Sequence, residues 1–191
     1  VVISGEQAFE TDFAQPPPFD EALYEEVLAV EGVDTAVRSI QDFAQLTDRE
    51  GGPIATGGAP ALAFGLDTEN EAYGRFTPLV LVDGDWPIAP GQVALDPKTA
   101  QAEDYAVGDS IGIRTRGPVE EFEIVGLAKF GSVDSIGGAT VAYFSIDEAQ
   151  RVFRKEGKLD GIQVAAESST TAETLIARIE PILPAQTQVL T

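Results

Sequence analysis

The chain contains no cysteine and no histidine among its 191 residues. Without cysteine it has no disulfide framework, no thiolate nucleophile and no cysteine-ligated metal. Without histidine it lacks the Ser-His-Asp triad, the Cys-His pair, the usual zinc ligand sets and the common proton carrier near neutral pH. An enzyme built from this sequence is left with paired carboxylates, a lysine nucleophile, or a carboxylate-bound magnesium or calcium ion.

Methionine and long apolar runs are also absent. Because translation starts at methionine, we expect Val1 to follow earlier residues of a longer polypeptide. No stretch approaches the roughly 18 apolar residues that cross a bilayer, and none has the layout of a signal peptide. We therefore expect any membrane segments of the parent protein to lie outside residues 1–191.

Basic residues are scarce: 12 lysines and arginines face 32 acidic residues, for a net charge of -20. Such a field repels phosphate backbones and anionic lipid headgroups, which argues against nucleic acid as a partner. Residues 1–50 contain twelve of the acids and only Arg38 and Arg49 as bases. A solvated acidic face explains this bias better than a dedicated cation site.

The first fifty residues predict strand, helix, strand. Residues 1–3 start a strand, and a helix with Asp20 as its N-cap places Leu23, Val27 and Leu28 on one face before Gly32 stops it. Residues 33–46 are rich in β-favouring side chains and predict a long strand.

The C-terminal end repeats this order. Residues 161–165 alternate as a strand does, and residues 170–173 read as a capping box for a helix with Leu175, Ile176 and Ile179 on one face. Residues 187–190 predict a last strand. Two such units packed together make a split βαβ, ferredoxin-like sandwich.

The middle of the chain has a different texture and begins after glycine-rich breaks at 51–53 and 57–58. We expect a short helix over 97–104, and a capping box at 145–148 opens another that runs to Gly157. The expected strands are 61–66, 79–82, 92–95, 110–115, 121–128 and 140–144. The sequence thus predicts an α+β fold, in which a discontinuous split-βαβ (porter-type) subdomain of residues 1–50 and 158–191 carries an inserted mixed β-rich subdomain, 51–157.

The strongest candidate for a metal site is Asp83 and Asp85 with Asp96, because aspartates one residue apart can present oxygens to a hard cation. Trp86 and Pro87 interrupt the series before a calcium loop is complete. A tight turn between strands explains the Asp-Gly-Asp sequence better.

Acidic pairs offer weaker candidates for general acid and base. Glu25-Glu26 and Glu120-Glu121 are adjacent, and adjacency does not set the carboxylate separation that catalysis needs. Glu121 and Glu123 share one face of an alternating segment, which is the pattern of a half-buried strand. We therefore predict no catalytic, cofactor-binding or metal-binding residue.

Three further features bear on partners. Trp86 is either an exposed anchor or a core residue. Residues 131–138 are rich in glycine and serine but lack the lysine of a phosphate loop, which leaves a mobile loop. A basic group could complement its helix end, the acidic first quarter of the chain, or a second copy, and consists of Arg151, Arg154, Lys155 and Lys158.

Five motifs together resemble the core domain of MacB/FtsX-type ABC-transporter permeases. Residues 81–96 resemble its G-x-W/F-P stretch followed by P-G-E/Q-V-hydrophobic-L. In family order there follow the turn at Ala100, Tyr105 and 107–111, the F-x-I-V-G strand at 122–127, the A-Q helix at 149–153, and the return strand at 160–164. With the flanking βαβ halves, the similarity extends over nearly the whole chain.

The resemblance implies a non-catalytic domain between the first two transmembrane helices, on the periplasmic or extracellular side of the plasma membrane, without cofactors. Its implied partners are the permease's own helices and a cytoplasmic ATPase, and a second permease copy stays open. The substrate, any outside partner and the contact surface stay unknown. Two alternatives remain from the residues themselves: a stand-alone extracellular binding or adhesion module, and, more distantly, a carboxylate-dependent hydrolase using Asp83, Asp85 and Asp96.

Overall fold

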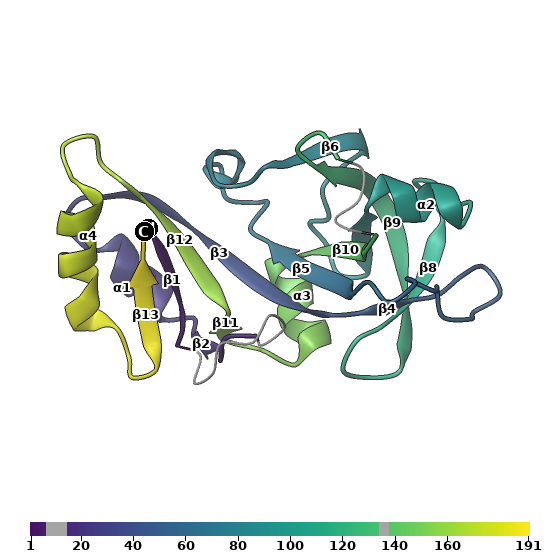
Figure 1. The fold of residues 1–191 in the computed structure, drawn as a ribbon, viewed down its shortest axis with the longest axis horizontal. Helices are drawn as coiled ribbons and strands as arrows, with labels where there is room; N and C mark the ends of the chain where they lie inside the picture. The colour runs from purple at the N-terminus through teal and green to yellow at the C-terminus, as the bar shows by residue number, and fades with distance from the viewer. Residues whose placement is uncertain (7–14, 134–137) are drawn as a thin grey trace.

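The computed structural model describes residues 1–6, 15–133 and 138–191. Within these ranges, one eleven-stranded sheet has the order β13-β1-β12-β3-β5-β10-β7-β9-β8-β4, with β6 beside β9, and a small second sheet pairs β2 with β11. The edge strand β4 is Gln45–Leu46. Figure 1 shows an elongated molecule with α1 and α4 at one end and α2 at the other. None of the helices in these ranges is long and apolar enough to cross a membrane.

Four strands and two helices form one end of the molecule, which we call the base. Its strands lie in the order β13, β1, β12, β3, and each neighbouring pair is antiparallel. Along the chain these are the fourth, first, third and second strands, which is the arrangement of interlocked βαβ units and confirms the predicted ferredoxin-like fold. The elements are β1 (Val2–Gly5), α1 (Leu23–Leu28), β3 (Val33–Phe43), β12 (Gly161–Ala166), α4 (Ala172–Ile179) and β13 (Thr187–Leu190).

The remaining large elements form the other end, which we call the head. Its sheet is mixed, because β10 runs parallel to β5 and antiparallel to β7, and β7 runs parallel to β9. The predicted strands and helices of this region are all present. They are β5 (Ala61–Leu66), β6 (Leu79–Gly84), β7 (Gln92–Leu95), α2 (Pro97–Ala102), β8 (Ser110–Arg114), β9 (Val119–Phe130), β10 (Thr140–Ser145) and α3 (Ile146–Phe153).

Strand β3 belongs to both ends of the molecule. Its first part pairs with β12, from Val33 to Ser39, and its last part pairs with β5, from Ser39 to Phe43. In Figure 1 this strand runs from the base into the head. Base and head therefore share one continuous sheet.

Apolar packing is also continuous between the two ends. The main core cluster includes Ile3 and Ile162 in the base, Ile40 on β3, and Phe144 and Ile146 in the head. A second cluster within the head gathers around Tyr143 and Ala128. The long strand β3 thus lies within a single folded unit.

The helix of the first βαβ unit begins later than predicted. Phe19 and Asp20 form β2, which pairs with β11 (Lys158–Leu159), so the N-cap of α1 is Ala22. The Asp20 carboxylate accepts a hydrogen bond from the Ala22 amide at 3.0 Å but caps no helix. Of the three apolar residues placed on one face of this helix, Leu23 and Val27 are buried and Leu28 is 36% exposed.

Two other helix ends differ from the prediction. Thr171 caps α4 by accepting from the Thr174 amide, so the cap lies one residue later than expected and Glu173 takes no part in it. Helix α3 ends at Phe153, because Arg154 adopts a left-handed φ of 56° and the Lys155 amide turns back to the Gln150 carbonyl. The predicted end at Gly157 is therefore wrong.

Candidate functional site

The two ends of the chain lie side by side in the base. Strands β1 and β13 are antiparallel, with Val2 opposite Leu190 and Gly5 opposite Thr187. In Figure 1 the C-terminal label lies at the start of β1. The first and last strands of the chain thus lie against each other at one end of the molecule.

Between base and head, Arg38 of β3 binds two carboxylates from different parts of the fold. Its guanidinium lies 2.7 Å from Asp67, which follows β5, and 2.9 Å from Glu21, which precedes α1. Asp67 is 2% exposed and also accepts from the Arg38 amide at 3.0 Å. Burial alone would lower the pKa of Arg38, but the bonds to Asp67 and Glu21 outweigh burial and raise it.

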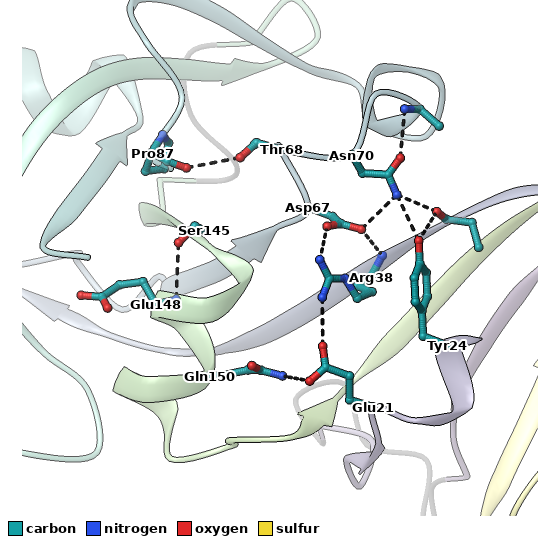
Figure 2. A network of polar contacts seen from close by, with 12 residues as sticks. Glu21, Tyr24, Arg38, Asp67, Thr68, Asn70, Pro87, Ser145, Glu148 and Gln150 are labelled. Atoms are coloured by element: carbon teal, nitrogen blue, oxygen red, sulfur yellow. Dashed lines mark hydrogen bonds and ion pairs between the residues drawn. The ribbon is translucent and has the colours of Figure 1, made fainter. Parts of the chain in front are cut away.

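Further polar contacts surround this ion pair, as Figure 2 shows. The Asn70 amide donates to the Ala36 carbonyl at 2.9 Å and lies within hydrogen-bonding distance of Tyr24 and Asp67. On the other side, Gln150 of α3 donates to Glu21 at 2.9 Å. We call these residues the neck network: Glu21, Tyr24, Arg38, Asp67, Asn70 and Gln150.

A second charged cluster lies further along β3. Asp42 is 3% exposed and forms ion pairs with Arg116 at 2.8 Å and with Lys155 at 3.7 Å. Lys155 also binds Asp160 at 2.7 Å and donates to the Gln41 carbonyl. Buried charges in both clusters are paired, as their desolvation cost requires.

A groove of about 360 Å³ is lined by residues of both base and head. Val37 and Gln163 line it from the base, while Tyr73 and Phe76 line it from the segment that joins β5 to β6, and Leu79 from the start of β6. Burial raises the pKa of Tyr73 to about 12, so this phenol is neutral at physiological pH. The width of the groove depends on how the head is held relative to the base.

Of the three aspartates of the predicted metal alternative, Asp96 and Asp83 make separate local hydrogen bonds, and Asp85 is exposed. Asp96 is buried and uses one oxygen to cap α2 through Thr99 and the other to accept from the Val141 amide. Asp83 lies exposed at the end of β6 and bonds the next amide, that of Gly84. In the described ranges no three acidic side chains gather as a metal site would require.

The basic group is largely paired within the chain. Lys158 binds Asp20 at 3.2 Å, and Lys155 reaches Asp42, so two members contact the acidic first quarter. Arg151 binds Glu120 and Glu148 within the head. The interpretation that this group complements the N-terminal acids fits these contacts.

The remaining candidate residues are Trp86, the acidic pairs and the glycine-rich loop. Trp86 is half-buried and lies edge-on to Tyr73, with ring centroids 6.2 Å apart, so it packs in the second core cluster. Glu25 and Glu26 lie in the first turn of α1, and Glu121 lies on β9. Of the glycine-rich loop, residues 134–137 lie outside the described residues.

Four of the five motifs that carried the family resemblance lie in the head, and the fifth forms β12 of the base. Gly84 and Gly126 face each other across β6 and β9, and a Cβ on Gly84 would lie 2.1 Å from the Val125 carbonyl oxygen. In the turn motif, Asp109 accepts from the Ala106 amide, and its carbonyl accepts from the Ile124 amide of the next motif. These residue types are required by close backbone approach and turn geometry.

Sequence reasoning missed the neck network. Arg38 lies on the same face of β3 as the buried residues Ala36, Ile40 and Asp42. A lone arginine at an inward position of a strand needs a buried acid, and that was the available signal. Its partner Asp67 is distant in sequence, so the pair could not be named in advance.

Three solved structures share this fold. The extracellular domain of a noncanonical ABC-type transporter, YknZ, from Gram-positive bacteria has a TM-score of 0.71 and 16% identity, over 100% of this chain and 99% of that one. The periplasmic region of MacB from Actinobacillus actinomycetemcomitans has a TM-score of 0.65 and 11% identity, over 95% of this chain and 80% of that one. A domain of a putative permease protein from Porphyromonas gingivalis has a TM-score of 0.52 and 12% identity, over 95% of this chain and 81% of that one.

No curated protein matches the sequence. The family model of the MacB-like periplasmic core domain matches residues 1–182. That match covers nearly the whole chain and agrees with the fold of the three structures. The chain therefore belongs to the MacB-like periplasmic core domain family, the extracytoplasmic domains of MacB- and YknZ-like ABC-transporter permeases.

Proposed function

We propose that this domain performs no catalysis and transmits ATP-driven movement of the permease helices to the outside of the membrane. The observation that carries the proposal is the pairing of β1 with β13, which brings both ends of the chain to one place. Two helices attached there would move the base as a unit. The head would then follow through an arc, as a lever does.

In this proposal, residues 1–50 and 158–191 form the attached subdomain and residues 51–157 the subdomain it carries. Strand β3 supports the division, because it changes its partner from β12 to β5 at Ser39. The energy comes from a cytoplasmic ATPase, the partner that the family implies. The work is done at the head, on an exported substrate or on a protein outside the membrane.

A non-catalytic role is supported by what the acidic side chains do. Asp83 and Asp85 of the hydrolase alternative are exposed, and both carboxylate oxygens of Asp96 accept backbone hydrogen bonds. The buried carboxylates Asp42, Asp67 and Glu148 each face an arginine. A general acid or base needs a free proton site, and these pairs do not supply one.

The test is a distance measurement in the parent permease, reconstituted with its ATPase in lipid nanodiscs. Because residues 1–191 contain no cysteine, Gln101→Cys at an exposed position of α2 gives one labelling site in the domain once any cysteine elsewhere in the permease is replaced. A fluorophore there can transfer energy to labelled lipid headgroups. We expect the transfer efficiency to change during steady ATP hydrolysis. With an ATPase variant that binds ATP but does not hydrolyse it, we expect no change in efficiency over repeated cycles. Steady hydrolysis with no change in efficiency would contradict the proposal.

A further inference from the structure

We propose that the Arg38–Asp67 ion pair is the joint that makes base and head move as one body, and that Arg38 is thus a positioning residue for force transmission. The inference rests on the proposed function, because it names the contact through which movement of the base reaches the head. It concerns the neck network, which the family resemblance did not indicate.

The pair lies where β3 loses a neighbour. From Ser39 onward β3 has β5 on one side, and Ser39 opposite Leu66 is the last pair of that ladder. Before Ser39, β3 is paired with β12 alone in the sheet order. A strand bends most easily where its ladder ends, so the change of partner is the natural hinge between head and base.

Asp67 closes this hinge in place of a strand. It follows Leu66 directly, and its carboxylate accepts from the Arg38 amide at 3.0 Å, so a side chain makes the next backbone hydrogen bond of the ladder. The other oxygen binds the Arg38 guanidinium at 2.7 Å. Backbone and side chain of one base residue are thereby held by one head residue.

The same guanidinium holds the opposite side of the neck. Its second nitrogen binds Glu21, which in turn receives Gln150 of α3. Figure 2 shows Arg38 between the two acids, with Asn70 and Tyr24 closing the network beside Asp67. Loss of Arg38 would leave a carboxylate that is 2% exposed without its cation, and the Asp67 loop would have to move toward water.

Another ion pair crosses the same gap but is too exposed to act as the joint. Arg75 of the head binds Asp34 of β3 at 2.7 Å, with side chains 56% and 42% exposed. Exposed pairs of this kind hold their partners weakly, because water and salt screen them. The buried pair of Lys155 with Asp160 joins residues only five apart in the chain, next to the boundary between the two parts. The buried pair of Arg38 with Asp67 is therefore the contact to test.

The test measures the distance between base and head in the 191-residue chain. Glu173→Cys on α4 and Gln101→Cys on α2 are exposed positions at opposite ends, and the absence of native cysteine makes the spin labels unique. By double electron-electron resonance, we expect one narrow distance distribution for the unsubstituted neck. With Arg38→Met we expect that narrow peak to be lost in favour of a broad distribution.

Arg151→Met is the matched control. Arg151 also binds one buried acid, Glu148 at 3% exposure, and one half-exposed acid, Glu120 at 38%, but all three residues lie in the head. We expect its distribution to stay narrow. A narrow peak with Arg38→Met, or equal broadening with Arg151→Met, would overturn the inference.

If Arg38→Met does not give a folded circular dichroism spectrum, Asp67→Asn tests the same joint. The amide has the shape of the carboxylate and can still accept from the Arg38 backbone, but it no longer attracts the guanidinium. We expect the same loss of the narrow peak, and a narrow peak would refute the joint. The measurement needs neither ATP nor membrane, so its failure is distinguishable from failure of the proposed function.

Discussion

Glu148 is a buried acid whose charge stabilises the head. Burial alone would raise its pKa, but hydrogen bonds from Arg151 and the Gly91 amide outweigh burial and hold the pKa below its ordinary value of 4.5. A carboxyl with a depressed folded pKa adds stability above its unfolded pKa, and this is lost as pH falls through the folded pKa. Glu148 should therefore stabilise the domain at neutral pH and lose that effect in acid.

We predict that Glu148→Gln lowers the free energy of unfolding by about 1–3 kcal/mol at pH 7, because the three hydrogen bonds to this carboxylate are weakened. The difference from wild type should shrink as pH falls below 4.5, the ordinary pKa of the side chain. Urea unfolding across a pH series measures it. Asp147→Asn, at an exposed neighbouring position, is the control, and a difference that persists unchanged into acid would refute the account.

Gly65 sets how closely α3 approaches the sheet. A Cβ on Gly65 would lie 2.5 Å from the Cβ of Ala149, which is shorter than carbon atoms tolerate. We predict that Gly65→Ala lowers the unfolding free energy by about 1–3 kcal/mol, through overpacking. Gly74→Ala is the control, since nothing lies within 4 Å of its Cβ position, and it should stay within about 0.5 kcal/mol of wild type. Equal effects of the two changes in thermal or urea unfolding would contradict the packing explanation.

At the scale of elements, the N-cap of α4 differs between the sequence-based prediction and the structure. Thr171 accepts from the Thr174 amide at 3.2 Å, whereas the sequence pattern started one residue earlier, at Thr170. We predict that Thr171→Ala destabilises the domain by about 1 kcal/mol, because one helix-end amide loses its acceptor. Thr170→Ala should cost less than about 0.5 kcal/mol. If chemical unfolding shows that Thr170→Ala destabilises the domain more than Thr171→Ala, Thr170 is the N-cap and the prediction is wrong.

Most elements were predictable because their signals are local. The glycines and prolines at the breaks, the short apolar run of β10, and the capping sequence before α3 each act over a few residues. The predicted boundaries failed where a distant segment intervened. Asp20 left the helix because β11 pairs with it from more than a hundred residues away, and Arg154 ended α3 in a left-handed conformation that non-glycine residues seldom adopt.

The neck was not predictable for the same reason. Arg38 and Asp67 lie 29 residues apart, and Glu21 meets Gln150 across 129 residues. No periodicity relates such positions, and they meet only once β3 has paired with both β12 and β5. The sequence could indicate that Arg38 needs an acid, but the choice among 32 acids depends on the folded sheet.

At the scale of the whole molecule, the domain is one sheet with both ends of the chain at the base. The pairing of β1 with β13 agrees with the expectation that both ends attach to neighbouring helices. Strand β3 carries the sheet into the head, and the neck network stiffens the point where it changes partner. Force applied at the ends therefore has a continuous hydrogen-bonded path to α2 and β9.

The most direct test of this account is to soften the attachment of the domain in the assembled permease. A flexible Gly-Ser segment of about ten residues placed directly after Thr191 would let the base rotate freely on its neighbouring helix. The same segment between Gly57 and Gly58, exposed residues with open space around them, is the control. We predict that the insertion after Thr191 abolishes export while ATP hydrolysis continues, and that the control insertion leaves both intact; undiminished export with the softened attachment would contradict the account.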